Sequence, residues 1–598
     1  MFSYFAIVNK NQASATAAEN IKNKILRTFP DFEINFSSKG LLILSNSKNI
    51  RDINTYTIGN NRGIILGNLF TRIGPYSGGR ASQKQIDLDS DSIIGSNGSH
   101  LLKEYWGVYV AFMLSRNGDT CVIRDPSGFM PVYKYDTEDF HLLFSDGGHF
   151  RSLNLNNLSI DRKHALPYII MPLHYRMTGI NGIDKVMPGE LMSINLDNIS
   201  RVLLWHPNDI ASSPIDLADT EAAKLLKDVI MSTTHAWASN YSNICARCSG
   251  GLDSSIILSC LVRSPNFPHI TGLHHYSLGY SDSDERDYAH LAAQYCNVNL
   301  IEKEDIADEI DISILDDFEY LPEPTSDRCM LGVSVSQKKL ADQFGFQVFF
   351  GGEGGDGLFV SNPRNISADY IKYKGFDKLF FEMCMRDGEL SKRSLASVSI
   401  EAIKARFQSE KWQPSDFFHE KHLLFTEEAS NEIDFDHILD HVFSRMSNHS
   451  AAKRKHVLYS LGAYPYQRPC RRQDQVRQID PFLSQPVIET VLALPTYQFS
   501  HNATDRGLAR LAFADICHPM NIKRQSKGGP EAFYKKIYEN NIEYLRENLM
   551  DGMLVKYGII DRSSLEHSLS DDSNRALATW GNIIEIIGVE FWARKWFG

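Results

Sequence analysis

From about Asp216 onward, apolar segments with strand character alternate with amphipathic helical segments, and this alternation constrains the fold more than any other feature. Strands joined by helices in this way pair in parallel, with helices on both faces of the sheet. We therefore expect an α/β domain that becomes mostly helical toward Gly598. The expected strands are Ile244–Cys248, Ile270–Leu278, Asn299–Lys303 and Gln347–Phe350, and the expected helices are Asp219–Ser239, Ser254–Val262 and Glu285–Cys296.

The first 200 residues have a different texture. Short alternating or β-branched runs are separated by turn residues such as Asn117–Gly118 and Asp125–Pro126, which predicts a β-rich domain with sheets packed face to face. A chain of 598 residues is too long for one core. We expect an α+β arrangement overall, with domains at 1–208 and 216–598 and a linker at His206–Pro214.

Composition excludes several classes of function. The 62 basic and 73 acidic residues give a net charge of −11 without a dense basic run, which argues against a nucleic-acid partner. We find neither a secretory signal at Met1–Val8 nor an apolar run long enough for a bilayer, so we expect no membrane association. The nine cysteines are scattered, and the single CxxC, Cys245 and Cys248, falls on an expected strand rather than in a zinc or redox setting. We therefore expect a cytoplasmic protein with reduced thiols.

The segment Ser249-Gly250-Gly251-Leu252-Asp253-Ser254-Ser255 lies between an expected strand and an expected helix. Its glycines allow the backbone to turn so that amide N–H groups surround an anion, and the start of the helix adds a positive dipole end. Asp253 would repel a phosphate unless a divalent cation lay between them. A turn that only caps a helix is the alternative, but the whole string favours a pyrophosphate loop. It is not a Walker loop, because GxxxxGK[ST] does not occur.

Two further segments are candidates for the same site. Gly351-Gly352-Glu353-Gly354-Gly355-Asp356-Gly357 follows another expected strand, so both loops should meet at the carboxyl edge of the sheet. Asp253 and Asp356 can then share a Mg²⁺; a flexible glycine hairpin is the alternative. Lys527, between Ser526 and Gly528, suits stabilisation of a charged transition state, although a solvated surface loop explains it equally well.

Together, SGGLDSS and GGEGGDGLF resemble the synthetase domain of the asparagine synthetase family, whose loops bind ATP, Mg²⁺ and pyrophosphate. Arg124–Gly128, Phe144–Asp146 and Met187–Glu190 are similar to segments of that family's glutaminase domain. The resemblance implies a glutaminase-like sandwich of the class II amidotransferase type, followed by an adenine-nucleotide α-hydrolase-like domain.

One departure from the family is informative. Its glutaminases use an N-terminal cysteine, whereas here the second residue is Phe2 and the first cysteine is Cys121. Without a thiolate nucleophile, glutamine cannot be split by that route. We expect the first domain to be a degenerate remnant and the nitrogen to come from an amine of the substrate.

Family members that close rings in this way include β-lactam synthetases and the cyclases of lasso peptides. Several segments look more like the lasso cyclases: Gly67–Phe70, Tyr105–Gly107, Ser283–Arg286, Pro481–Pro486, Asp505–Arg510 and Ser526–Glu531. This likeness implies antibiotic (RiPP) biosynthesis, with a precursor peptide as substrate and a leader peptidase as partner. Asparagine synthetase and β-lactam synthetase activities are the alternatives among enzymes, and a non-catalytic peptide-binding scaffold is the alternative of another class.

The resemblance also assigns roles to residues. It implies that Ser249, Gly250, Gly251, Asp253 and Ser254 hold pyrophosphate, that Leu278 and Gly352 border the adenosine, that Asp253 and Asp356 bind Mg²⁺, and that Lys527 and Glu353 are catalytic. The general base stays open among Glu382, Asp387 and Glu389. Tyr464–Arg472 either lines the peptide cavity or ends a helix with snorkelling arginines.

Overall fold

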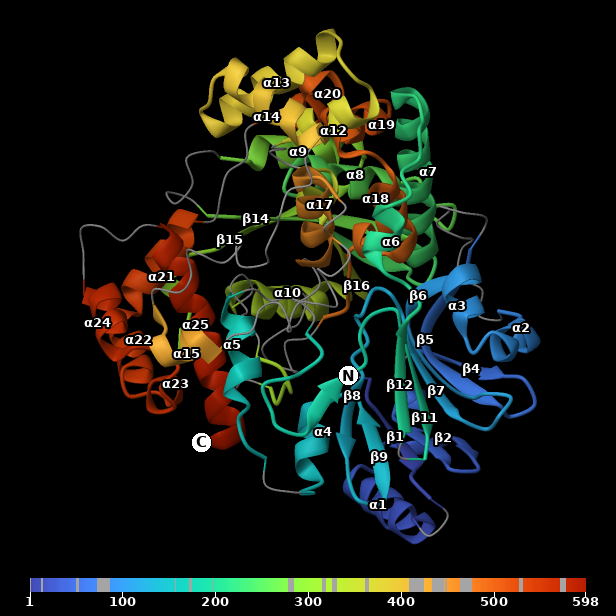
Figure 1. Cartoon of the computed structure of the whole chain (residues 1–598). Helices are drawn as coiled ribbons and strands as arrows, with labels where there is room; N and C mark the ends of the chain where they lie inside the picture. Colours follow the sequence, from blue (N-terminus) through green and yellow to red (C-terminus); the bar gives the residue numbers. More distant parts are fainter. Residues whose placement is uncertain are drawn as a thin grey trace.

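The computed structural model shows the chain from Phe2 to Gly598 (Figure 1). It describes these residues except 12–13, 50–52, 73–85, 156–157, 171–174, 197, 278–283, 314–318, 325–330, 361–364, 408–423, 433–445, 447–448, 463–475, 526–530 and 571–576. Within the described part, no helix has both the length and the apolar character needed to cross a membrane.

The first part of the chain is a sandwich of two antiparallel sheets, as the sequence predicts. Their inner faces share a core that includes Ala6, Ile43, Leu66 and Phe112. One sheet has the order β10 (Ile183–Lys185), β8 (Tyr133–Asp136), β9 (Phe140–Phe144), β1 (Tyr4–Asn9), β3 (Leu41–Ser45) and β2 (Glu33–Ser38). The other has the order β12 (Asn198–Leu203), β11 (Glu190–Asn195), β7 (Thr120–Arg124), β6 (Tyr105–Leu114), β5 (Gly63–Thr71) and β4 (Asn54–Ile58). The helices of this part are α1 (Ala15–Thr28), α2 (Ser90–Gly95), α3 (Ser99–Glu104), α4 (Gly147–Ser152) and α5 (Arg162–Ile170).

The second part is built on a parallel sheet, which confirms the expected α/β class. Its strand order is β15 (Asn299–Glu304), β14 (His269–Tyr276), β13 (Asn243–Arg247), β16 (Val348–Phe350) and β17 (Gln478–Ile479). Helix α10 (Leu331–Phe344) covers one face, where Ala341 packs with Cys245 and Leu273. The helices α8 (Leu252–Leu261) and α9 (Arg286–Tyr295) lie on the other face (Figure 1).

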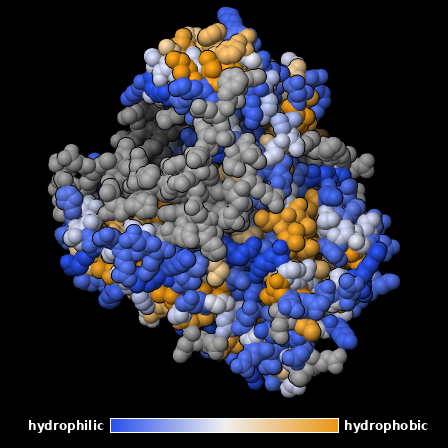
Figure 2. All heavy atoms as spheres, viewed as in Figure 1, coloured by the Kyte–Doolittle hydropathy of each residue, from blue (hydrophilic) through white to orange (hydrophobic). Residues whose placement is uncertain are grey.

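Most of the remaining chain is helical. These helices are α11 (Gly355–Leu358), α12 (Ile366–Tyr373), α13 (Lys378–Ser391), α14 (Leu395–Phe407), α15 (Glu427–Glu432), α17 (Ala451–Gly462), α18 (Gln485–Ala493), α19 (Gly507–Phe513), α20 (Pro519–Lys523), α21 (Glu531–Asn540), α22 (Ile542–Leu549), α23 (Met553–Lys556), α24 (Arg562–Ser570) and α25 (Leu577–Phe597). Figure 2 shows hydrophobic side chains gathered at the top of the molecule, over α13 and α14. Phe381, Met385 and Ile400 are among the exposed apolar residues there.

The expected linker is packed rather than open. It contains α6 (Pro207–Ala211), and two features favour a helix start there. Pro207 occupies the first position, and a ring nitrogen of His206 accepts a hydrogen bond from the Asn208 N–H at 3.1 Å. Asn208 is fully buried. From there the chain enters α7 (Asp219–Ala238), which packs against α18 and α19.

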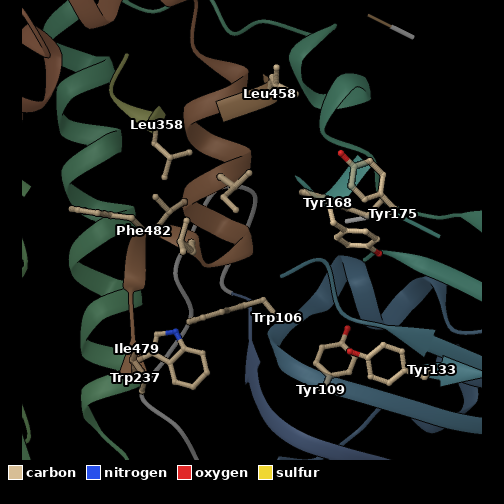
Figure 3. Packing of buried hydrophobic residues seen from close by; sticks show 14 of the residues in the cluster. Trp106, Tyr109, Tyr133, Tyr168, Tyr175, Trp237, Leu358, Leu458, Ile479 and Phe482 are labelled. Atoms are coloured by element: carbon tan, nitrogen blue, oxygen red, sulfur yellow. The ribbon is translucent and has the colours of Figure 1, made fainter. Parts of the chain in front are cut away.

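The two parts share one hydrophobic core (Figure 3). The Trp106 ring of β6 lies 6.0 Å from the Trp237 ring of α7, and Phe70 of β5 stacks on Trp106 at 4.5 Å. The Trp237 indole N–H donates to Ser484 Oγ, just before α18, at 3.0 Å. The strands of the sandwich are therefore packed directly against the helices that support the parallel sheet.

Candidate active site

The loop after β13, Ser249–Ser255, is called the first glycine loop. Gly250 has φ +71°, and a Cβ at this position would lie 2.4 Å from the Tyr288 carbonyl carbon, so only glycine fits here. Inside the loop, Ser249 Oγ lies 3.0 Å from Ser254 Oγ. Helix α8 starts at Leu252, directly after the two glycines, and its N-cap residue, Gly251, has no side chain to cap it.

Asn521 of α20 anchors the first glycine loop through its side-chain amide. Its side-chain amide donates to the carbonyl oxygens of Gly250 and Tyr288, both at 2.9 Å, and the residue is fully buried. One side chain thus ties the loop to α9. Nothing in the local sequence indicates this role, because Asn521 lies 271 positions from Gly250.

The second glycine loop, Gly351–Gly357, follows β16 and lies directly against the first. A Cβ on Gly352 would be 2.8 Å from the Asp253 carbonyl carbon, and a Cβ on Gly355 would be 2.5 Å from Asp253 Cγ. The glycines are therefore needed for the close approach of the two loops. Because β13 and β16 are neighbouring parallel strands, both loops lie at the same sheet edge, as expected.

Asp253 and Asp356 converge on one cation, the guanidinium of Arg506. Its Nη1 donates to Asp253 Oδ2 and to Asp356 Oδ1, each at 2.8 Å, and the two oxygens are therefore no more than twice that distance apart. Arg506 lies before α19 with φ +50°, and its side chain is almost completely buried. Burial opposes its charge, but the carboxylates of Asp253, Asp356 and Asp505 outweigh burial and raise the pKa of Arg506.

Arg506 was not predicted as a site residue. Its segment, Asp505–Arg510, was noted only for its likeness to lasso cyclases. Arg506 Nε also donates to Asp505 Oδ2 at 3.1 Å, and Arg510 Nε donates to the Asp505 carbonyl at 2.7 Å, which holds the backbone next to Arg506 in place.

The two carboxylates fit a magnesium site. Mg²⁺ is normally held by one or two carboxylates, with phosphate and water oxygens completing its coordination. The structure brings two carboxylates to one positive charge beside the first glycine loop. Among the described residues, no group of three or more His, Cys, Asp or Glu side chains could hold a metal without other ligands. A metal bound here would therefore need oxygens from a nucleotide or from water.

Glu353 lies at the outer side of the second glycine loop. Its carboxylate is 3.6 Å from Arg247 Nη1, and its backbone N–H donates to Asp480 Oδ1 at 3.0 Å. Arg247 Nη2 donates to the same Asp480 oxygen at 2.8 Å. Asp480 is buried, and together with Glu353 it raises the pKa of Arg247 against the opposing effect of burial. Arg247 is the charged last residue of β13, directly before the first glycine loop, and this position could have marked it as a site residue.

The three candidates for a general base lie on α13, and the structure gives Asp387 a different role. Asp387 Oδ2 accepts hydrogen bonds from the N–H, at 3.0 Å, and from the hydroxyl, at 2.6 Å, of Ser367 at the start of α12. This is the geometry of a helix cap, and burial raises the pKa of Asp387. Glu382 pairs with Lys378 one turn away, and Glu389 is exposed.

Other predicted positions lie outside the described residues: Leu278, Lys527 and Tyr464–Arg472. In the sandwich, Cys121 is buried in β7, where burial raises the pKa of its thiol. Cys245 and Cys248 are buried as well, and burial raises the pKa of Cys248 to about 12. Thiols with raised pKa values are poor nucleophiles at neutral pH.

Comparison with known proteins gives a family for the second part of the chain. The family model described as asparagine synthase matches residues 240–594, more than half of the chain. No curated protein matches. Among solved structures, the glutamine phosphoribosylpyrophosphate amidotransferase from B. subtilis, complexed with ADP and GMP, is 11% identical with a TM-score of 0.21, over 50% of this chain and 65% of that chain. The chain thus spans just under two thirds of that protein.

A second solved structure, described as the allosteric regulatory enzyme of purine biosynthesis, is 10% identical with a TM-score of 0.21, over 50% of this chain and 80% of that chain.

Proposed function

Because the chain belongs to the asparagine synthase family, we propose that it is an ATP-dependent ligase that activates a carboxylate as an acyl-adenylate and forms an amide from it. Family membership supports the ligase class and the use of ATP. The adenylate route, with AMP and pyrophosphate as products, is the finer part of the proposal.

The convergence of Asp253 and Asp356 carries this proposal. Two acidic side chains from loops after neighbouring strands meet beside a glycine loop at the start of a helix. A site of this kind suits a metal–nucleotide complex, in which the aspartates bind the cation and the glycine loop binds phosphate oxygens. Magnesium bound there would supply Lewis-acid stabilisation of negative charge on the phosphate oxygens.

For the acceptor, we propose an amine of the same molecule, so that the product is a macrolactam of the lasso peptide type. The segments that resemble lasso cyclases support this choice by their position. Asp505–Arg510 supplies Arg506 to the two aspartates, and Pro481–Pro486 follows Asp480, which binds Arg247 and the second glycine loop. A precursor peptide and a leader peptidase would then be its partners, in the cytoplasm.

The proposed reaction has two steps. An Asp or Glu carboxylate oxygen of the peptide attacks the α-phosphorus of ATP, and the bond to pyrophosphate breaks. The peptide's α-amine then attacks the acyl carbon, AMP leaves, and the ammonium proton passes to a base. Holding amine and acyl group together contributes about 7–11 kcal/mol to such a step. Lys527 is the proposed cation for the charge that develops on phosphate.

The test compares acyl substrates. The purified protein is incubated with Mg²⁺ and ATP, first with aspartate and ammonia, then with leader-free peptides that carry a free α-amine and an Asp or Glu. We expect peptide-dependent release of AMP and pyrophosphate and a product lighter by one water. Formation of asparagine would instead support an asparagine synthetase. Peptide binding without ATP turnover would support the scaffold and contradict the ligase.

The variant Asp253→Asn tests the metal assignment in the same assay. We expect pyrophosphate release to fall at least about 100-fold, since one charged ligand of the metal is lost. The control is Asp228→Asn, whose carboxylate pairs with Lys224 on the exposed face of α7. Near-normal turnover in Asp253→Asn would contradict the assignment.

A further inference from the structure

The place of Arg506 has a consequence for the order in which metal and nucleotide bind. Its Nη1 donates to one oxygen of each aspartate at the same distance, 2.8 Å, and lies between them. A Mg²⁺ bound by those oxygens would lie about 2.1 Å from each. The guanidinium and the metal would then compete for the same two carboxylate oxygens, because two cations held that close together repel each other strongly.

We propose that Arg506 acts as a built-in counter-ion that keeps free divalent cations out of the Asp253–Asp356 site until a polyphosphate arrives. This inference rests on the proposed function, because it takes the ligand to be a metal–nucleotide. It makes metal binding and nucleotide binding strongly coupled rather than independent.

Charge explains the coupling. Without Arg506, two carboxylates would face each other beside the helix start, with Asp505 a third acid nearby. The guanidinium offsets this repulsion. Because its side chain is almost completely buried, its charge is itself stabilised by the nearby carboxylates. A free Mg²⁺ must displace it and leave a buried cation without two of its three acidic partners, which is costly. A polyphosphate offers the displaced guanidinium new anionic oxygens, so displacement becomes favourable.

The backbone around Arg506 is held in place, so we expect the Arg506 side chain to move rather than the main chain. Arg506 has φ +50°, Gly507 follows with its Cα packed against the His501 backbone, and Arg510 is tied to the carbonyls of Asp505 and Ile522. The start of α19 is therefore held in place. The four side-chain torsions of arginine are left to move the charge from the aspartates to a neighbouring anion.

The experiment uses Mn²⁺ as a paramagnetic probe of the magnesium site, with free Mn²⁺ measured by EPR in the full-length protein. Wild type should bind Mn²⁺ weakly without nucleotide, and Arg506→Met should bind it at least about tenfold more tightly. In Arg506→Met, the added substitution Asp253→Asn should abolish the gain, which locates the ion. Lys227→Met, which removes a positive charge paired with Asp515 at the surface, should leave Mn²⁺ affinity unchanged.

A second arm adds AMPCPP, an ATP analogue whose α,β-methylene bridge cannot be cleaved in the adenylation step. Its presence should raise Mn²⁺ retention by the protein much more in wild type than in Arg506→Met. If Arg506→Met fails to fold by circular dichroism, Arg506→Lys, which offers one point charge in place of the planar fork, should show an intermediate gain. Equal affinity of wild type and variant for Mn²⁺ alone would overturn the inference. Failure of the proposed function is a separate result: wild type would then bind no AMPCPP, or would never release pyrophosphate from ATP.

Discussion

At the scale of single residues, the site depends on positions where a side chain is missing. Gly352 and Gly355 allow the second glycine loop to touch Asp253, and Gly250 allows the first to touch Tyr288. Close packing of backbone on backbone places Asp253 and Asp356 within reach of one nitrogen. The glycines therefore do more than give the loops freedom, because they set the distance between the two carboxylates.

Gly355→Ala tests this directly. The new methyl group would lie 2.5 Å from Asp253 Cγ and 2.7 Å from its Oδ1, so the Asp253 side chain or the loops themselves must shift. Overpacking of this kind costs about 1–3 kcal/mol. We expect ATP affinity, measured by calorimetry, to fall at least about tenfold. The matched control is Gly148→Ala in α4, where the methyl would meet only the Asp146 side-chain oxygen at 3.3 Å. Equal affinities in the two variants would show that loop spacing does not matter.

At the scale of elements, the strands and helices that carry the site follow from the sequence. Strand β13 and helix α8 lie within two residues of their expected bounds, because apolar runs and glycine loops mark their ends. The Arg506–aspartate contacts and the Asn521 bonds do not follow, because no local pattern connects residues 150 or more positions apart. The sequence alone also does not show that Asp387 caps α12, because that contact depends on the packing of two helices. Asp387 was therefore among the candidates for the general base.

Helix α20 is the element whose contribution to the site is easiest to test. Asn521→Ala removes both hydrogen bonds to the backbone of Gly250 and Tyr288 and leaves two buried carbonyls without these donors. We expect the free energy of unfolding in urea to fall by about 1–3 kcal/mol, and ATP affinity to fall with it. Asn540→Ala is the control, because its bond to Asp308 is exposed and worth at most about 0.5 kcal/mol. Unchanged ATP affinity in Asn521→Ala would separate loop anchoring from nucleotide binding.

At the scale of the whole molecule, the sandwich is joined to the second part by buried polar contacts as well as by the shared core. Glu489 of α18 accepts hydrogen bonds from Arg72 and from the Trp205 indole. The Lys185 ammonium of β10 binds Glu323, which also accepts from the Tyr133 hydroxyl at 3.2 Å. Helix α18 follows Asp480 in the chain, and Asp480 accepts a hydrogen bond from the second glycine loop. By binding α18, the sandwich therefore also supports that loop.

The buried pair Lys185–Glu323 leads to the last prediction. Lys185→Met removes the ammonium that binds the buried Glu323 carboxylate, and breaking a buried pair in this way costs about 3–5 kcal/mol. The double variant Lys185→Met/Glu323→Leu removes both charges and should regain most of that loss. Chemical denaturation measures both, with Lys224→Met as the exposed control, expected to change stability by less than about 1 kcal/mol. Because one cluster of buried residues extends from Phe5 to Trp596, calorimetry should show a single transition that shifts as a whole in Lys185→Met. Two separate transitions, or a Lys185→Met variant as stable as Lys224→Met, would mean that the two parts unfold independently and that the sandwich does not support the site.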